Sequence, residues 1–115
     1  MRIDYSKVKI YIKPGHTDMR KHINSLSIYV NDNLKMDPLS GNLYLFCGKN
    51  RRRLKILYWD RNGFCLWQKR LEKDKFPWPA DEDEAKEISR DELFMLLDGI
   101  NFFHSYKRLT FSAVS

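Results

Sequence analysis

Residues 51–71 read RRRLKILYWDRNGFCLWQKRL, and this stretch decides the fold. Residues 53–59 and 64–71 each alternate their side chains between two faces, with the period of two that is typical of β-strands. Between these runs lies Asn62-Gly63, a dipeptide that supplies the positive φ angles of a tight hairpin turn. The stretch therefore predicts a long antiparallel hairpin over residues 53–71 that turns at Asn62-Gly63.

The chain before the hairpin predicts two strands and a helix. Residues 8–12 alternate apolar and polar side chains, which indicates a half-buried strand. Thr17 or Asp18 is then expected to cap a helix, because their side-chain oxygens accept hydrogen bonds from free backbone N–H groups. The apolar face of that helix repeats at helical spacing and consists of Met19, Ile23, Leu26 and Val30. Residues 42–48 form a second short, apolar strand.

A second helix is predicted near the end of the chain. Residues 76–79, FPWP, cannot continue a strand because proline lacks a backbone N–H. The acidic segment at about 80–87 is expected to be exposed and mobile. Ser89 and Glu92 fit a capping box that starts a helix, and its expected apolar face is Leu93, Leu96, Leu97 and Ile100. A variable, aromatic-rich tail covers about 102–115.

These elements together predict the fold class α+β. We expect a single small domain over residues 1–115, with a mainly antiparallel sheet, a long central hairpin and about two helices.

The charge is distributed unevenly along the chain. The net charge is +6, whereas residues 49–75 alone hold ten basic and three acidic residues and therefore carry +7. The rest of the chain is slightly acidic. Such an asymmetry favours an anionic partner for the basic half.

Basic and aromatic residues alternate along the predicted hairpin, an arrangement able to grip phosphates while a ring stacks on a base. We hypothesise phosphate contacts by Arg51, Arg52, Arg53, Lys55, Lys69 and Arg70, with Trp59 or Trp67 stacking nearby. The alternative is a solvated cationic face over a core of the same aromatics. The run 50–53, NRRR, favours phosphate contact, since guanidinium forks match phosphate oxygens.

A second candidate contact is Arg20 with Lys21, two cations in the expected first helical turn. Their functional interpretation is contact with an anion or a partner protein, and Trp78 is a candidate for the same role. The simpler interpretation of Arg20 is a structural ion pair with a carboxylate, and this one is favoured because most ion pairs are structural.

Several function classes find no support in the sequence. Asp18, Asp37 and Asp60 have no spacing that indicates a metal-dependent nuclease triad. The two cysteines and three histidines are scattered, which disfavours a metal site. No apolar run is long enough to span a membrane, and charges interrupt any signal-peptide core. We expect a cytoplasmic protein without enzymatic activity, cofactor, metal or small-molecule substrate.

Several short motifs, in this order and spacing, resemble one known family. They are TDMRK (17–21), NRRR (50–53), LYWD (57–60), KRLE (69–72), FPWP (76–79) and LLDG (96–99). The chain resembles the accessory protein of insertion-sequence family sixty-six, the TnpB-like product of the second reading frame. The resemblance implies a bacterial mobile element that also encodes a larger transposase with a carboxylate triad. It further implies a protein that assists transposition without holding the nuclease site.

The leading expectation is therefore a non-catalytic accessory protein that binds DNA at insertion-sequence ends and assists the separate transposase. The alternative is a protein–protein adaptor that docks on the transposase without touching DNA, with the hairpin and the Trp78 region as its contact surface.

Overall fold

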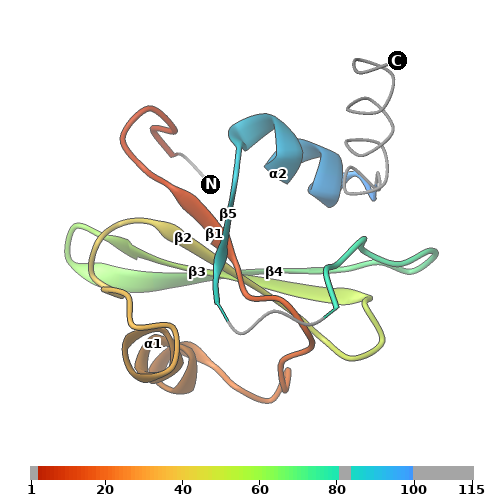
Figure 1. Cartoon of the computed structure of the whole chain (residues 1–115), viewed down its shortest axis with the longest axis horizontal. Helices are drawn as coiled ribbons and strands as arrows, with labels where there is room; N and C mark the ends of the chain where they lie inside the picture. The colour runs from red at the N-terminus through yellow and green to blue at the C-terminus, as the bar shows by residue number, and fades with distance from the viewer. Residues whose placement is uncertain (1–2, 81–83, 100–115) are drawn as a thin grey trace.

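The fold, taken from a computed structural model that describes residues 3–80 and 84–99, is one five-stranded sheet with a helix on each face (Figure 1). The elements in chain order are β1 (Ile10–Ile12), α1 (Ile23–Asp32), β2 (Leu43–Cys47), β3 (Arg53–Asp60), β4 (Gly63–Arg70), β5 (Lys86–Ile88) and α2 (Arg90–Leu97). The strand order is β4-β3-β2-β1-β5, and every neighbouring pair is antiparallel except β1 with β2. The predicted α+β class is confirmed.

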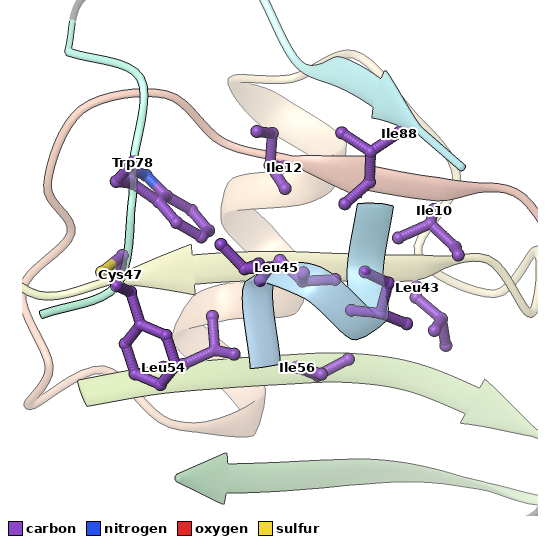
Figure 2. Close-up of a cluster of buried hydrophobic side chains, with 12 residues drawn as sticks. Ile10, Ile12, Leu43, Leu45, Cys47, Leu54, Ile56, Trp78 and Ile88 are labelled. Carbon is purple, nitrogen blue, oxygen red and sulfur yellow. The ribbon is translucent and has the colours of Figure 1, made fainter. Parts of the chain in front are cut away.

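Each face of the sheet has its own hydrophobic core, because side chains alternate between the faces along every strand. The α1-side core consists of Leu26, Val30, Tyr44, Phe46 and Leu57. The α2-side core is larger and includes Leu43, Leu45, Leu54, Ile56, Phe76, Trp78, Leu93 and Leu96 (Figure 2). All five residues of β2 are buried, since this central strand feeds both cores.

The hairpin is confirmed, but its turn lies one residue earlier than predicted. Asp60 pairs with Gly63, so the two turn residues are Arg61 and Asn62. Arg61 takes the left-handed conformation with φ of 49°, whereas Gly63 already belongs to β4. Pairing continues without a break to Arg53 and Arg70. The expectation that Asn62-Gly63 forms the turn is therefore wrong by one position.

The first helix begins later than predicted. It starts at Ile23, after His22, and residues 17–21 form a loop instead of a first turn. The Asp18 carboxylate accepts the backbone N–H of Arg20 at 2.9 Å and also its guanidinium, which closes a local turn that competes with helix formation. The predicted cap at Thr17 or Asp18 is wrong, although Leu26 and Val30 are buried as expected.

The second helix starts as predicted. Glu92 donates its backbone N–H to Ser89 Oγ, and Ser89 donates its backbone N–H to the Glu92 carboxylate. Before it, Lys86–Ile88 pairs with β1 as an edge strand, and Lys86 and Glu87 are exposed as the sequence predicted. Residues 81–83, Ile100 and the tail at 102–115 lie outside the described residues.

The buried face of α2 gives a direct stability prediction. Leu93 and Leu96 are fully buried, whereas Leu97 is only partly buried. We expect Leu96→Ala to lower the free energy of unfolding by about 2–5 kcal/mol, because it leaves a cavity in the α2-side core. Leu97→Ala should cost about 1 kcal/mol, in proportion to the smaller apolar area it loses. Urea unfolding of the two variants checks this order, and equal losses would contradict it.

Candidate nucleic-acid interface

The candidate site forms where β1 and β2, which pair in parallel, end at the same edge of the sheet. Parallel strands end at the same edge of a sheet, so the segment after β1 and the turn after β2 lie next to each other. The backbone N–H of Thr17 donates to the Cys47 carbonyl at 2.8 Å and ties the two segments together. A loop of residues 17–21 and a turn of residues 48–53 thus form two walls at one end of the sheet.

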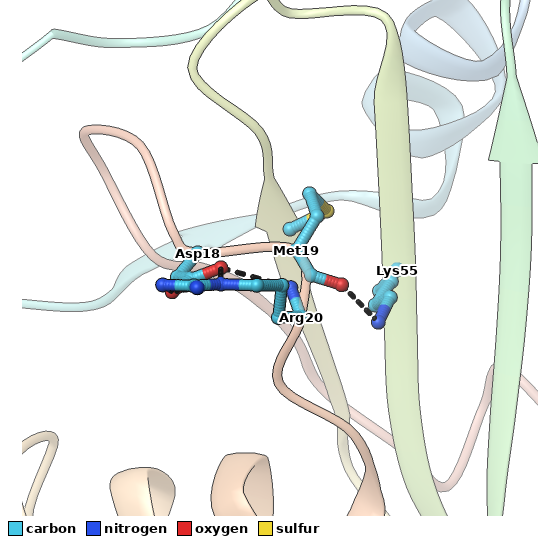
Figure 3. Close-up of polar contacts among 4 residues, drawn as sticks. All are labelled: Asp18, Met19, Arg20 and Lys55. Atoms are coloured by element: carbon cyan, nitrogen blue, oxygen red, sulfur yellow. Dashed lines mark hydrogen bonds and ion pairs between the residues drawn. The ribbon is translucent and has the colours of Figure 1, made fainter.

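The loop at 17–21 is held from inside by Lys55. This side chain is only 3% exposed, and its ammonium donates to the carbonyl of Met19 at 2.8 Å (Figure 3). The same ammonium also donates to the carbonyl of Lys21. Burial lowers the pKa of Lys55, and the nearby positive charge of Arg53 lowers it further. The two carbonyls offset the free-energy cost of burying this charge, because they accept the hydrogen bonds that the ammonium would otherwise make to water.

The turn at 48–53 approaches the loop closely. Gly48 donates its backbone N–H to the Arg53 carbonyl at 3.0 Å, and Arg51 adopts a left-handed φ of 62°. A Cβ added at Gly48 would lie 2.8 Å from Met19 Cγ, so any larger residue there would displace Met19. Glycine here therefore lets the two walls approach closely without displacing Met19.

Between the loop and the turn lies an open groove of about 880 Å³, which we call the basic groove. Five cations line it, Lys13, Arg20, Lys21, Lys49 and Arg53. Lys13 precedes the 17–21 loop and already donates to the carbonyl of His16 at 2.8 Å. Asp18 is the one carboxylate among the described lining residues, and it pairs with Arg20 at 2.7 Å. Hydrogen bonds from Arg20 lower the pKa of Asp18 to about 2, so this carboxylate stays ionised. The groove therefore carries a net positive charge.

A smaller pocket of about 180 Å³ continues the basic groove and shares His16, Gly48 and Lys49 with it. Arg51 and Trp78 line this extension. Trp78 is nevertheless a structural residue, since it is largely buried and its indole N–H donates to the carbonyls of Lys13 at 2.9 Å and Gly15 at 3.0 Å. It fixes the chain that leads into the 17–21 loop.

The structure divides the predicted phosphate contacts into two groups. Arg51, Arg52, Arg53 and Arg70 are exposed, whereas Lys55 is buried beneath the loop. Lys69 donates to the carbonyl of Leu97 at 2.9 Å, where a cation stabilises the end of α2. Both lysines hold structure together, and neither joins the basic groove.

The two predicted stacking residues do not share a face. Trp59 lies edge-on to Phe64, with ring centroids 5.0 Å apart, on the side of the sheet that carries α1. Trp67 packs against the α2-side core. The hairpin is therefore not one basic and aromatic ribbon. Arg20 and Lys21, which the sequence placed in a separate helix, come together with Arg53 instead.

Sequence reasoning missed Lys13 and the role of Lys49 in this groove. Both lie within two residues of the ends of strands that pair in parallel. The hydrophobic pattern of a strand does not specify its neighbour. The favoured interpretation of Arg20 as half of a structural ion pair agrees with its bond to Asp18. Its side chain is nonetheless 92% exposed and open to a further anion.

Lys55 gives a prediction about the loop. Lys55→Met keeps the length of the side chain and removes the donors to two carbonyls. We expect a loss of about 1–3 kcal/mol in unfolding free energy, the cost of leaving buried polar groups unsatisfied. Thermal or urea unfolding measures it, with the exposed Lys73→Met as control. Unchanged stability would show that water replaces the ammonium.

The described residues hold no group of three or more histidine, cysteine or acidic side chains that could bind a metal ion. None of the helices described is long and apolar enough to cross a membrane. Cys47 is buried, which raises the pKa of its thiol to about 12.

The structure defines the class of protein: a small α+β domain with a basic groove at one end of its sheet. The chain belongs to the IS66 Orf2-like family, whose model matches residues 8–107, and it is thus an accessory protein associated with insertion sequences. The resemblance seen in the motifs is confirmed.

Two relatives from Sinorhizobium fredii, strain NGR234, are similar over most of the chain. The uncharacterized protein y4hO is 43% identical over 97 residues, which cover 84% of each chain. The uncharacterized protein y4jC is 33% identical over 95 residues, covering 83% of this chain and 81% of the relative. No solved structure matches the chain.

Proposed function

We propose that this protein binds DNA through the basic groove and assists the separate transposase of its insertion sequence without catalysing a reaction itself. The observation that carries the proposal is the convergence on one groove of Lys13, two cations of the 17–21 loop and two of the 48–53 turn, with a single carboxylate among the described lining residues. Arg51 and Arg52 extend the positive surface beside it, since both are exposed.

Binding would rest on the phosphate backbone. Each lysine or arginine that neutralises a phosphate releases a condensed counterion, and this release drives association. Phosphate contacts position a protein on DNA and carry no direct sequence information. We therefore propose a helper that acts in the cytoplasm and organises the ends of the element, while the transposase supplies sequence recognition and chemistry.

The groove's fixed geometry supports this role. The 17–21 loop is tied to β2 by Thr17, to β3 by Lys55 and, through the residues before it, to Trp78. The backbone that carries its cations is therefore held in place before DNA arrives, and less backbone entropy is lost on binding.

The experiment that tests the proposal is a binding titration of the purified protein with labelled duplexes of one length, either an element end or unrelated DNA. We expect both to bind at ~50 mM salt and both to weaken as salt rises. Suppose instead that neither duplex binds, while the protein co-purifies with its transposase from nuclease-treated extract. The protein is then a protein–protein adaptor, and the DNA proposal fails.

A further inference from the structure

The basic groove has a floor as well as charged walls. Met19, Tyr29 and Gly48 supply apolar surface among its lining residues. Thr17 also lines it and is only 6% exposed, and its hydroxyl has no hydrogen-bond partner within the part of the chain that the structure describes. A buried hydroxyl without a partner is costly, and this one lies where a ligand or water would supply one. The hydroxyl could donate to a phosphate oxygen, whereas a site for phosphates alone would not need the apolar surface.

The size of the groove points to more than a phosphate. The groove is open, and its volume of about 880 Å³ leaves room for more than a phosphate. The backbone of an intact duplex presents only phosphates and sugars to a protein surface, and its bases stay stacked inside. An unpaired nucleotide can place its base in such a groove.

Tyr29 provides an aromatic surface between cations. The Lys21 ammonium lies 5.1 Å from the centroid of its ring, and that of Lys13 lies 5.8 Å away. The ring is supported by Phe46, which it meets edge-on at 6.2 Å. Both ammonium groups lie over the ring itself. A base that stacks on Tyr29 therefore takes the place of one of them, and the displaced lysine can then bind an adjacent phosphate, as in proteins that hold single strands on aromatic rings between cations.

We infer that the basic groove takes an unpaired nucleotide of a DNA strand, such as a strand end or a single-stranded extension. The base lies against Tyr29 and Met19, and the flanking phosphates contact Arg20, Lys21 and Arg53. This inference rests on the proposed function and makes it more specific. A groove that takes an unpaired nucleotide favours strand ends and unpaired segments over continuous duplex.

The test compares a blunt duplex with the same duplex carrying a short unpaired 3′ extension, by fluorescence anisotropy with the full-length protein. We expect the extension to raise affinity by about fivefold to 150-fold, the equivalent of stacking one base at 1–3 kcal/mol. Tyr29→Leu should reduce this ratio to below about threefold, whereas Tyr29→Phe, which keeps the ring, should preserve it. Arg61→Ala, at the far turn of the hairpin, is the matched control and should change neither affinity.

A second readout uses the unaltered protein, so it does not depend on whether Tyr29→Leu folds. A 2-aminopurine placed in the extension should lose fluorescence at saturation, because stacking quenches it. Equal affinity for the two DNAs, or unchanged fluorescence at saturation, would overturn the inference while leaving backbone binding in place. Failure to bind any of these DNAs would overturn the proposed function as well.

Discussion

Replacing Phe46 with alanine should lower the free energy of unfolding by about 3–5 kcal/mol, the range for losing a buried aromatic side chain. Phe46 is fully buried on the central strand β2, where it packs with Leu26 and Val30 of α1. It also supports the ring of Tyr29. Its removal therefore opens a cavity between the sheet and α1.

The comparison variant for Phe46→Ala is Ile28→Ala, on the exposed side of α1. Ile28 is 58% exposed, so its loss should change stability by no more than about 0.5 kcal/mol. Urea unfolding followed by circular dichroism measures both variants. A loss below about 1 kcal/mol for Phe46→Ala would show that α1 does not pack on the sheet as described, since filled core sites do not tolerate such truncation.

The double variant Arg20→Ala with Arg53→Ala should weaken DNA binding about sixtyfold at ~0.1 M salt. Each phosphate contact multiplies the affinity for duplex DNA by roughly the inverse of the molar salt concentration, raised to the power 0.9. The variant removes two such contacts. For the same reason the slope of log affinity against log salt should become shallower by about 1.8. The two residues come from opposite walls of the groove, so the variant tests whether both walls touch DNA.

The control for this variant removes the same amount of charge elsewhere. Arg61 and Arg90 are exposed, each lies near an adjacent aspartate, and neither lines the basic groove. Arg61→Ala with Arg90→Ala should leave the salt slope within error of the unaltered protein. If both double variants weaken binding equally, net charge and not the groove governs the affinity.

The features that the sequence predicted well are those with local causes. The hairpin depends on alternation and a turn between adjacent strands, and the capping box depends on two residues three positions apart. The hairpin turn was displaced by one residue because Arg61 itself accepts a left-handed φ. The start of α1 was misplaced because the turn around Asp18 competes with the helix.

The features that the sequence did not predict depend on contacts between distant segments. The groove exists because β1 pairs in parallel with β2, a choice that no periodicity in either strand specifies. The structural roles of Lys55 and Lys69 follow from carbonyls 36 and 28 residues away in the chain. A count of basic residues therefore found the charged region but could not separate structural cations from exposed ones.

The salt dependence of DNA binding by the unaltered protein tests the central claim most directly. Four groove cations, Arg20, Lys21, Lys49 and Arg53, predict a slope of log affinity against log salt near −3.6 on duplex DNA and near −2.8 on a single strand, at about 0.9 and 0.7 per contact. A titration over ~50–200 mM salt measures both slopes. A slope near zero, or no binding at the lowest salt, would contradict the account of this groove as a DNA-binding site.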